Sequence, residues 1–116
     1  MAIDKPLTTF FGVGATQTIT QVTFLKANLT SSRTPPAFVP LTGTDTNTSE
    51  STFLSLFLRI WENQDTSQDS QLAIFGPDVA LVEVVSDGVA KPFEQYIFQV
   101  RVLVPKGQSM PNPNLV

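Results

Sequence analysis

The sequence predicts an all-β fold: an antiparallel β-sandwich, jelly-roll-like or a small barrel, with extended N- and C-terminal arms. Three observations predict it. Residues 95–104, QYIFQVRVLV, alternate between an apolar and a mixed face, as a strand with one buried side does. The chain has 14 Thr, whose β-branched side chain suits a pleated strand. Only 15% of the 116 residues are charged and 41% are hydrophobic, which is enough apolar material for one core.

Three further stretches carry strand signals. Residues 16–25, TQTITQVTFL, read as a polar strand whose irregular apolar spacing indicates a bulge or a half-covered edge. Residues 72–75 and 79–85 form another strand, interrupted by Gly-Pro-Asp. The turn signal at residues 86–88 makes 79–85 and 95–104 an antiparallel pair joined by a loop of moderate length. Residues 53–62 and 72–75 likewise flank a polar loop at 63–71 and are expected to form a second pair. Two meanders of this kind are expected to pack face to face.

Residues 53–62, FLSLFLRIWE, fit two patterns. As a strand, one face carries Leu or Ile at every second position from 54 to 60. As a helix, the same segment has an i, i+3, i+4 apolar stripe, and Ser49 or Ser51 could cap its N-terminus. We expect the strand, because a continuing helix would enter residues 63–71, which have no apolar stripe. The predicted core then contains Leu56, Leu58, Ile60, Phe98, Val100 and Val102.

The length fits one domain, with a core at 15–104, an N-terminal arm at 1–14 and a C-terminal arm at 105–116. Both arms are rich in residues that break helices and strands. Residues 28–52 form a long connection, and such loops are usually functional or disordered.

The composition excludes several classes of function. The chain has no Cys and no His, so it lacks the commonest transition-metal ligands and the commonest general base, and we expect no cofactor and no enzyme activity. The net charge is −3 and the seven basic residues are dispersed, which argues against nucleic-acid binding. No apolar run is long enough to cross a membrane, and the N-terminus lacks the apolar stretch of a signal peptide.

One loop has the beginning of a calcium pattern. Asp45, Asn47 and Glu50 supply oxygen donors at close intervals, but the Gly and the distal Glu of a calcium loop are missing. A solvated loop is the favoured interpretation. Calcium stays open as part of an alternative function, a carbohydrate-binding type of β-sandwich module.

The apolar residues of the arms and of the long loop predict an interface. Phe10 and Phe11 are adjacent, so in an extended arm they face opposite ways and need cover on both sides. The expected interface residues are Phe10, Phe11, Phe38, Val39, Leu41, Met110 and Leu115. We therefore expect a non-enzymatic structural protein that forms a homo-oligomer, a trimer or dimer, and contacts another structural protein. At the level of architecture this description is similar to bacteriophage capsid decoration proteins, which implies a place in the virion, with the cytoplasm as the alternative.

Overall fold

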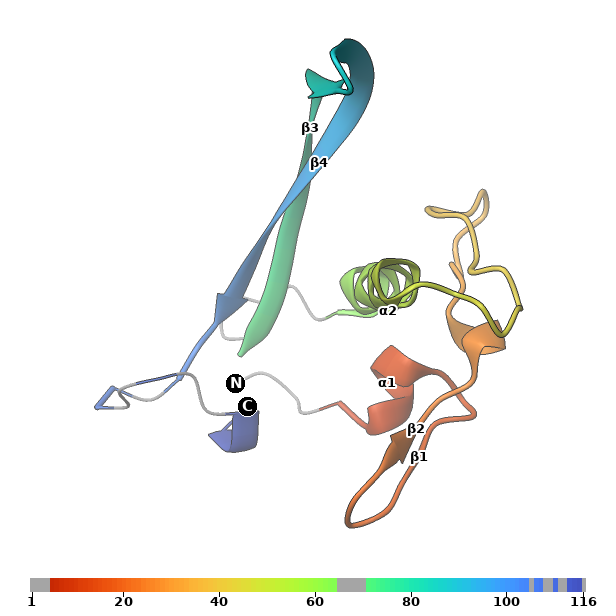
Figure 1. Cartoon of the computed structure of the whole chain (residues 1–116). Helices are drawn as coiled ribbons and strands as arrows, with labels where there is room; N and C mark the ends of the chain where they lie inside the picture. The colour runs from red at the N-terminus through yellow and green to blue at the C-terminus, as the bar shows by residue number, and fades with distance from the viewer. Residues whose placement is uncertain (1–4, 65–70, 105, 108–109, 111–112, 116) are drawn as a thin grey trace. The chain divides into compact units, whose positions relative to one another are not determined.

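The computed structural model describes residues 5–64, 71–104, 106–107, 110 and 113–115. The chain divides into two compact units, Met1–Asp65 and Thr66–Val116, and each is described by itself. The first unit contains α1 (Leu7–Phe11), β1 (Thr16–Gln17), β2 (Val22–Thr23), the 3-10 turn η1 (Lys26–Asn28) and α2 (Ser49–Asn63) (Figure 1). The second contains β3 (Leu72–Ser86), β4 (Val89–Val102) and the 3-10 turn η2 (Pro113–Leu115).

The predicted β-sandwich is wrong. Strand β1 pairs only with β2, and β3 only with β4, so the described residues hold two sheets of two strands each and no closed sandwich or barrel. A sandwich needs several strands in each layer, and the segment expected to supply one of them is helical. The division of residues 1–116 into one domain with two arms stays a prediction.

Helix α2 replaces the strand predicted at residues 53–62. Its N-cap is Thr48, whose Oγ1 accepts a hydrogen bond of 3.1 Å from the backbone N–H of Ser51, and Glu50 lies in the first turn. The helix ends at Asn63, and Gln64 is already extended. The helix therefore ends where the apolar stripe ends. It does not continue into the polar residues 64–71, which were the reason for expecting a strand.

Helix α1 also corrects the prediction of an extended N-terminal arm. It contains Phe10 and Phe11, and it packs against α2. Gly12 ends it with a φ of 93°, and a Cβ on Gly12 would lie 2.4 Å from Cβ of Asn28. The chain thus needs glycine there both for the left-handed turn and for the close approach of η1.

The first unit buries little. Leu29 is fully buried, and Ser55 is the buried residue of α2, while Leu56, Leu58 and Ile60 are only half-buried. The ring of Phe11 lies against that of Phe24, with centroids 5.5 Å apart. The segment predicted as one strand at 16–25 is a small hairpin, in which Thr18 Oγ1 accepts hydrogen bonds from the N–H groups of Thr20 and Gln21.

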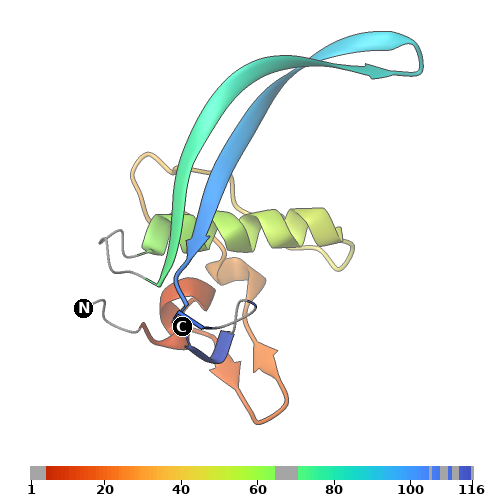
Figure 2. The ribbon, with the colours of Figure 1, turned by 90° about the vertical axis from the view of Figure 1, so that its left-hand side faces the viewer.

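The second unit is a long antiparallel hairpin. It confirms the predicted strands at 72–75 and 79–85 and their antiparallel pairing with the last strand, but that strand is Val89–Val102 rather than 95–104, so 79–85 pairs with 90–96 and 72–75 pairs with 99–102 instead of with 53–62. The ribbon curves and twists along its length (Figure 2). Asp87 and Gly88 both have positive φ, 53° and 75°, which is the two-residue turn that matches strand twist. The connection is therefore shorter than predicted. Between Phe75 and Asp78 the register shifts at a bulge, where Gly76 has a φ of 108°.

The core predicted for the last strand is mostly exposed. Val100 and Val102 are 54% and 41% exposed and Phe98 is half-buried, whereas Ala73 and Ile74 are buried. The alternating pattern predicts a strand here correctly, but among the described residues no second sheet covers its apolar face. In the part of the chain that the structure describes, no helix has the length and hydropathy needed to cross a membrane.

We expect Thr48→Ala to lower the free energy of unfolding of the helical unit by about 1 kcal/mol, because it removes the N-cap acceptor of α2. The measurement is urea unfolding followed by the helical circular-dichroism signal. The matched control is Ser49→Ala, which changes the exposed neighbour inside the helix and should leave stability nearly unchanged. Equal losses in the two variants would contradict the assignment of Thr48 as the cap.

Candidate interaction surface

The register of the hairpin sorts its side chains onto two faces, because directly opposed residues of an antiparallel pair point to the same side. We call one the Leu81 face and the other the Phe93 face. Beyond the bulge, the Leu81 face consists of the pairs Val79–Tyr96, Leu81–Glu94, Glu83–Pro92 and Val85–Ala90. The Phe93 face consists of Asp78–Ile97, Ala80–Gln95, Val82–Phe93, Val84–Lys91 and Ser86–Val89.

Both faces are apolar and both are exposed. Leu81 is 77% exposed on one face and Phe93 51% on the other. The further large apolar side chains exposed beyond the bulge are Val79, Val84, Val85, Val89, Tyr96 and Ile97. A two-stranded ribbon has no layer of its own to cover either face, and an isolated hairpin is at best marginally stable. Large exposed apolar surfaces occur more often at binding interfaces than elsewhere, which makes the hairpin the candidate interaction surface.

Charged side chains lie among the apolar ones on both faces. Glu83 and Glu94 lie on the Leu81 face, and Asp78 and Lys91 lie on the Phe93 face. The Tyr96 hydroxyl donates a 3.0 Å hydrogen bond to Glu94, and this bond together with the carboxylate charge raises the pKa of Tyr96. Nearer the strand ends, the Arg101 guanidinium lies 5.4 Å from the centre of the Phe75 ring.

The interface residues predicted from sequence do not form this surface. Phe10, Phe11, Phe38 and Leu41 are half-buried in the first unit, and Val39 is exposed there. Met110 is exposed in the second unit, and the side chain of Leu115 lies outside the described residues. The Phe11 ring packs against Phe24 within the same unit. Part of the apolar contact that we expected from an interface is therefore made inside the chain. The role of these residues in an interface stays a prediction.

Sequence reasoning missed the exposed residues of the hairpin. The signal was present in residues 79–85, VALVEVV, which is apolar at almost every position rather than at every second one. That pattern belongs to a strand with apolar neighbours on both sides. We expected a second sheet to supply them, whereas the described residues leave both sides open.

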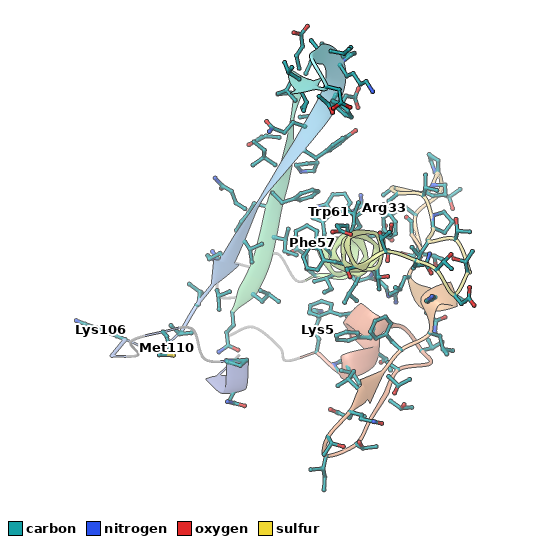
Figure 3. All side chains as sticks on the ribbon, in the orientation of Figure 1. Lys5, Arg33, Phe57, Trp61, Lys106 and Met110 are labelled. Atoms are coloured by element: carbon teal, nitrogen blue, oxygen red, sulfur yellow. The ribbon has the colours of Figure 1, made fainter. Side chains whose placement is uncertain are left out.

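The densest polar cluster lies in the first unit, where Glu62 of α2 holds the segment after Thr30. Its carboxylate accepts hydrogen bonds from Ser31 Oγ at 2.6 Å, from Ser32 Oγ at 2.7 Å and from the Ser32 backbone N–H. Arg33 lies 5.1 Å from the centre of the Trp61 ring, and Figure 3 shows the two side chains together at α2. Partial burial acts to raise the pKa of Glu62, but the bonds from Ser31 and Ser32 and the charge of Arg33 outweigh it, so the pKa is lowered.

The Ser31–Glu62 contact has the outline of a nucleophile and its base, but its bonding is structural. Besides donating to Glu62, Ser31 Oγ accepts from the N–H groups of Ala37 at 2.9 Å and Arg33 at 3.3 Å. A hydroxyl oxygen has two lone pairs, so both are engaged. These hydrogen bonds hold the segment at Ser31 and Ser32 against the last turn of α2.

The loop with the partial calcium pattern contacts a lysine. The Lys26 ammonium donates to Thr44 O at 2.6 Å and to Asn47 Oδ1 at 2.7 Å, and Asn47 Nδ2 donates to Thr42 O at 3.0 Å. Of the three residues of that pattern, Asn47 therefore already binds an internal cation. Among the described residues, no group of three or more acidic side chains is placed to hold a metal ion.

Comparison of the chain with protein-family models, with curated proteins and with solved structures gives no match. The hairpin surface therefore has to be interpreted from its own chemistry.

The lowered pKa of Glu62 predicts a pH dependence. Since the folded carboxyl titrates below its unfolded value of 4.5, its contribution to stability is present above about pH 4.5 and is lost as the pH falls through the folded pKa. Glu62→Gln should therefore be less stable than the parent at neutral pH, and the difference should shrink in acid. Unfolding measured as a function of pH checks this.

A second variant tests the cause of that shift. Ser31→Ala removes one donor to the carboxylate, so it should raise the pKa of Glu62 measured by NMR titration. A carboxyl that titrates in the parent protein at or above its ordinary value of 4.5 would contradict the described geometry.

Proposed function

We propose that this protein is a non-enzymatic assembly component, and that the β3–β4 hairpin is the arm that connects it to neighbouring subunits. One observation carries the proposal: beyond the bulge, both faces of a two-stranded ribbon expose large apolar side chains. Full burial of a single Val, Leu or Phe side chain is worth about 1.5–3 kcal/mol, so covering several of them on a neighbour is a strong driving force.

The aromatic side chains of the hairpin support the same proposal. Tyr96 and Phe93 are residue types enriched at interfaces, one on each face. An arm with two such faces fits between two layers of a neighbouring subunit or sheet.

The setting that we propose is a viral capsid surface, where the protein would act as a decoration or cement component, as a dimer or trimer. The Thr-rich surface of low charge and the hairpin arm support it. A sugar-binding module is not proposed, because it depended on a β-sandwich that the described residues do not form.

The test is self-association of the purified chain, measured by sedimentation velocity over a range of concentrations. We expect an oligomer, and we expect Phe93→Glu to weaken its association about 10- to 100-fold, the range that corresponds to a lost buried aromatic side chain. The matched control is Ile19→Glu, which places the same charge on a fully exposed apolar residue of the β1–β2 hairpin and should leave association unchanged. A parent chain that remains monomeric at all concentrations, or equal weakening by both substitutions, would contradict the proposal.

A further inference from the structure

The two outer edges of the hairpin differ in their backbone hydrogen-bonding groups. The residues that flank a two-residue turn exchange hydrogen bonds, and bonded and non-bonded pairs then alternate along the ladder. Ser86–Val89 is such a bonded pair, so Val85, Glu83, Leu81 and Val79 direct their N–H and C=O groups away from β4. Among the described strands β3 has β4 as its one neighbour, so this edge carries a row of unpaired groups.

Two observations agree with this assignment. Pro92 is opposite Glu83, which the alternation makes a non-hydrogen-bonded pair. Proline lacks a backbone N–H, so it fits a position that does not donate to the neighbouring strand. At the other end of the ladder the Leu103 N–H donates to Gln71 O at 2.8 Å, which continues the same alternation along β4. Level with residues 79–85, the outer edge of β4 is interrupted by Pro92, whereas that of β3 is continuous.

We infer that residues 79–85 of β3 are a strand-addition site, and that the partner is the same segment of a second copy in antiparallel orientation. This inference rests on the proposed function and names the contact that it uses. The segment has four Val, no Pro and no Gly, which is the composition of strands that pair with another chain.

The register follows from the segment itself. Centring the pair on Val82 places Val79 opposite Val85 and Leu81 opposite Glu83, which joins the whole segment with roughly eight backbone hydrogen bonds. A shift that centres the pair on Glu83 sets the two Glu83 carboxylates against each other, and like charges in direct opposition are destabilising. A shift the other way, centred on Leu81, brings Pro77 opposite Val85. The Val82 register avoids both costs.

This register also joins the apolar surfaces of the two copies. The two-fold axis is perpendicular to the sheet, so each face of one hairpin continues into the same face of the other. On the Phe93 face, the row across the four strands is Phe93–Val82 of one copy followed by Val82–Phe93 of the second. The contact is closed, since the two outer strands of the new sheet are both β4, where Pro92 interrupts further pairing.

The test uses a cysteine at the two-fold axis. The chain has no cysteine of its own, so a single substitution gives an unambiguous cross-link. In a non-hydrogen-bonded pair the Cα atoms lie about 4.5 Å apart, within the range of a disulfide. We expect Val82→Cys to form a disulfide-linked dimer on mild oxidation. Ala80→Cys alone should not, because its two copies lie roughly 13 Å apart in this register.

A mixture provides the positive control. Ala80→Cys and Val84→Cys face each other across the dimer, so a mixture of the two proteins should give the mixed dimer while neither alone cross-links. If Val82→Cys fails to fold, the mixture still tests the contact between the two β3 strands. An oligomeric parent with no cross-link from Val82→Cys or from the mixture would overturn the β3 contact but leave the assembly function standing. A monomeric parent would overturn both.

Two proline variants separate the edges. Leu81→Pro and Glu94→Pro remove outward N–H groups at the same level of the ladder, one from β3 and one from β4. Leu81→Pro should raise the dissociation constant of the dimer at least about tenfold, since two hydrogen bonds are lost per dimer. Glu94→Pro should leave it within about twofold. The opposite order of effects, measured by sedimentation in proteins that keep their β circular-dichroism signal, would overturn the assignment of the edge.

Discussion

The constraint behind most features of this molecule is that a two-stranded ribbon cannot cover its own side chains. Every residue of β3 and β4 faces one side or the other of a single layer, and backbone pairing satisfies only the groups directed inward. If the side chains were polar, water would solvate both faces and the hairpin would need nothing else. Here many of them are Val, Leu, Ile, Phe and Tyr, so the ribbon by itself leaves large apolar side chains uncovered.

The first unit uses polar contacts where a larger domain would use a core. Leu29 is fully buried there, and most apolar side chains of α2 are only half-covered. Loops are held instead by side chains that each make several bonds: Glu62 accepts three, and Lys26 donates two. Such bonds are short-range and directional, so they fix the path of a chain with few apolar contacts. These hydrogen bonds hold the loops of the first unit in place although few of its apolar side chains are buried.

The sequence predicted local pairing better than it predicted architecture. The antiparallel partners in β3 and β4 and the turn at 86–88 follow from alternation and from Asp-Gly, which are local signals. Residues 53–62 were misjudged, because an apolar run of ten residues satisfies a period of two and a period of 3.6 together. The deciding feature was Thr48, which lies just outside the segment that we compared. Burial was misjudged for a different reason: it depends on whether a second layer exists, and no local pattern shows that.

If the hairpin is the association site that we propose, its two edges limit how copies can meet. Its faces expose many apolar side chains, whereas its edges are not alike. Pro92 removes a donor from the outer edge of β4, and Glu83 places a charge in the middle of the free segment of β3. A proline limits which edge can receive a strand, and a single carboxylate limits the registers in which like strands can meet. Both residues cost something in strand propensity. In our proposal, Glu83 in the run of Val, Ala and Leu at 79–85, and Pro92 on the neighbouring strand, select one closed contact among several that hydrophobicity alone would allow.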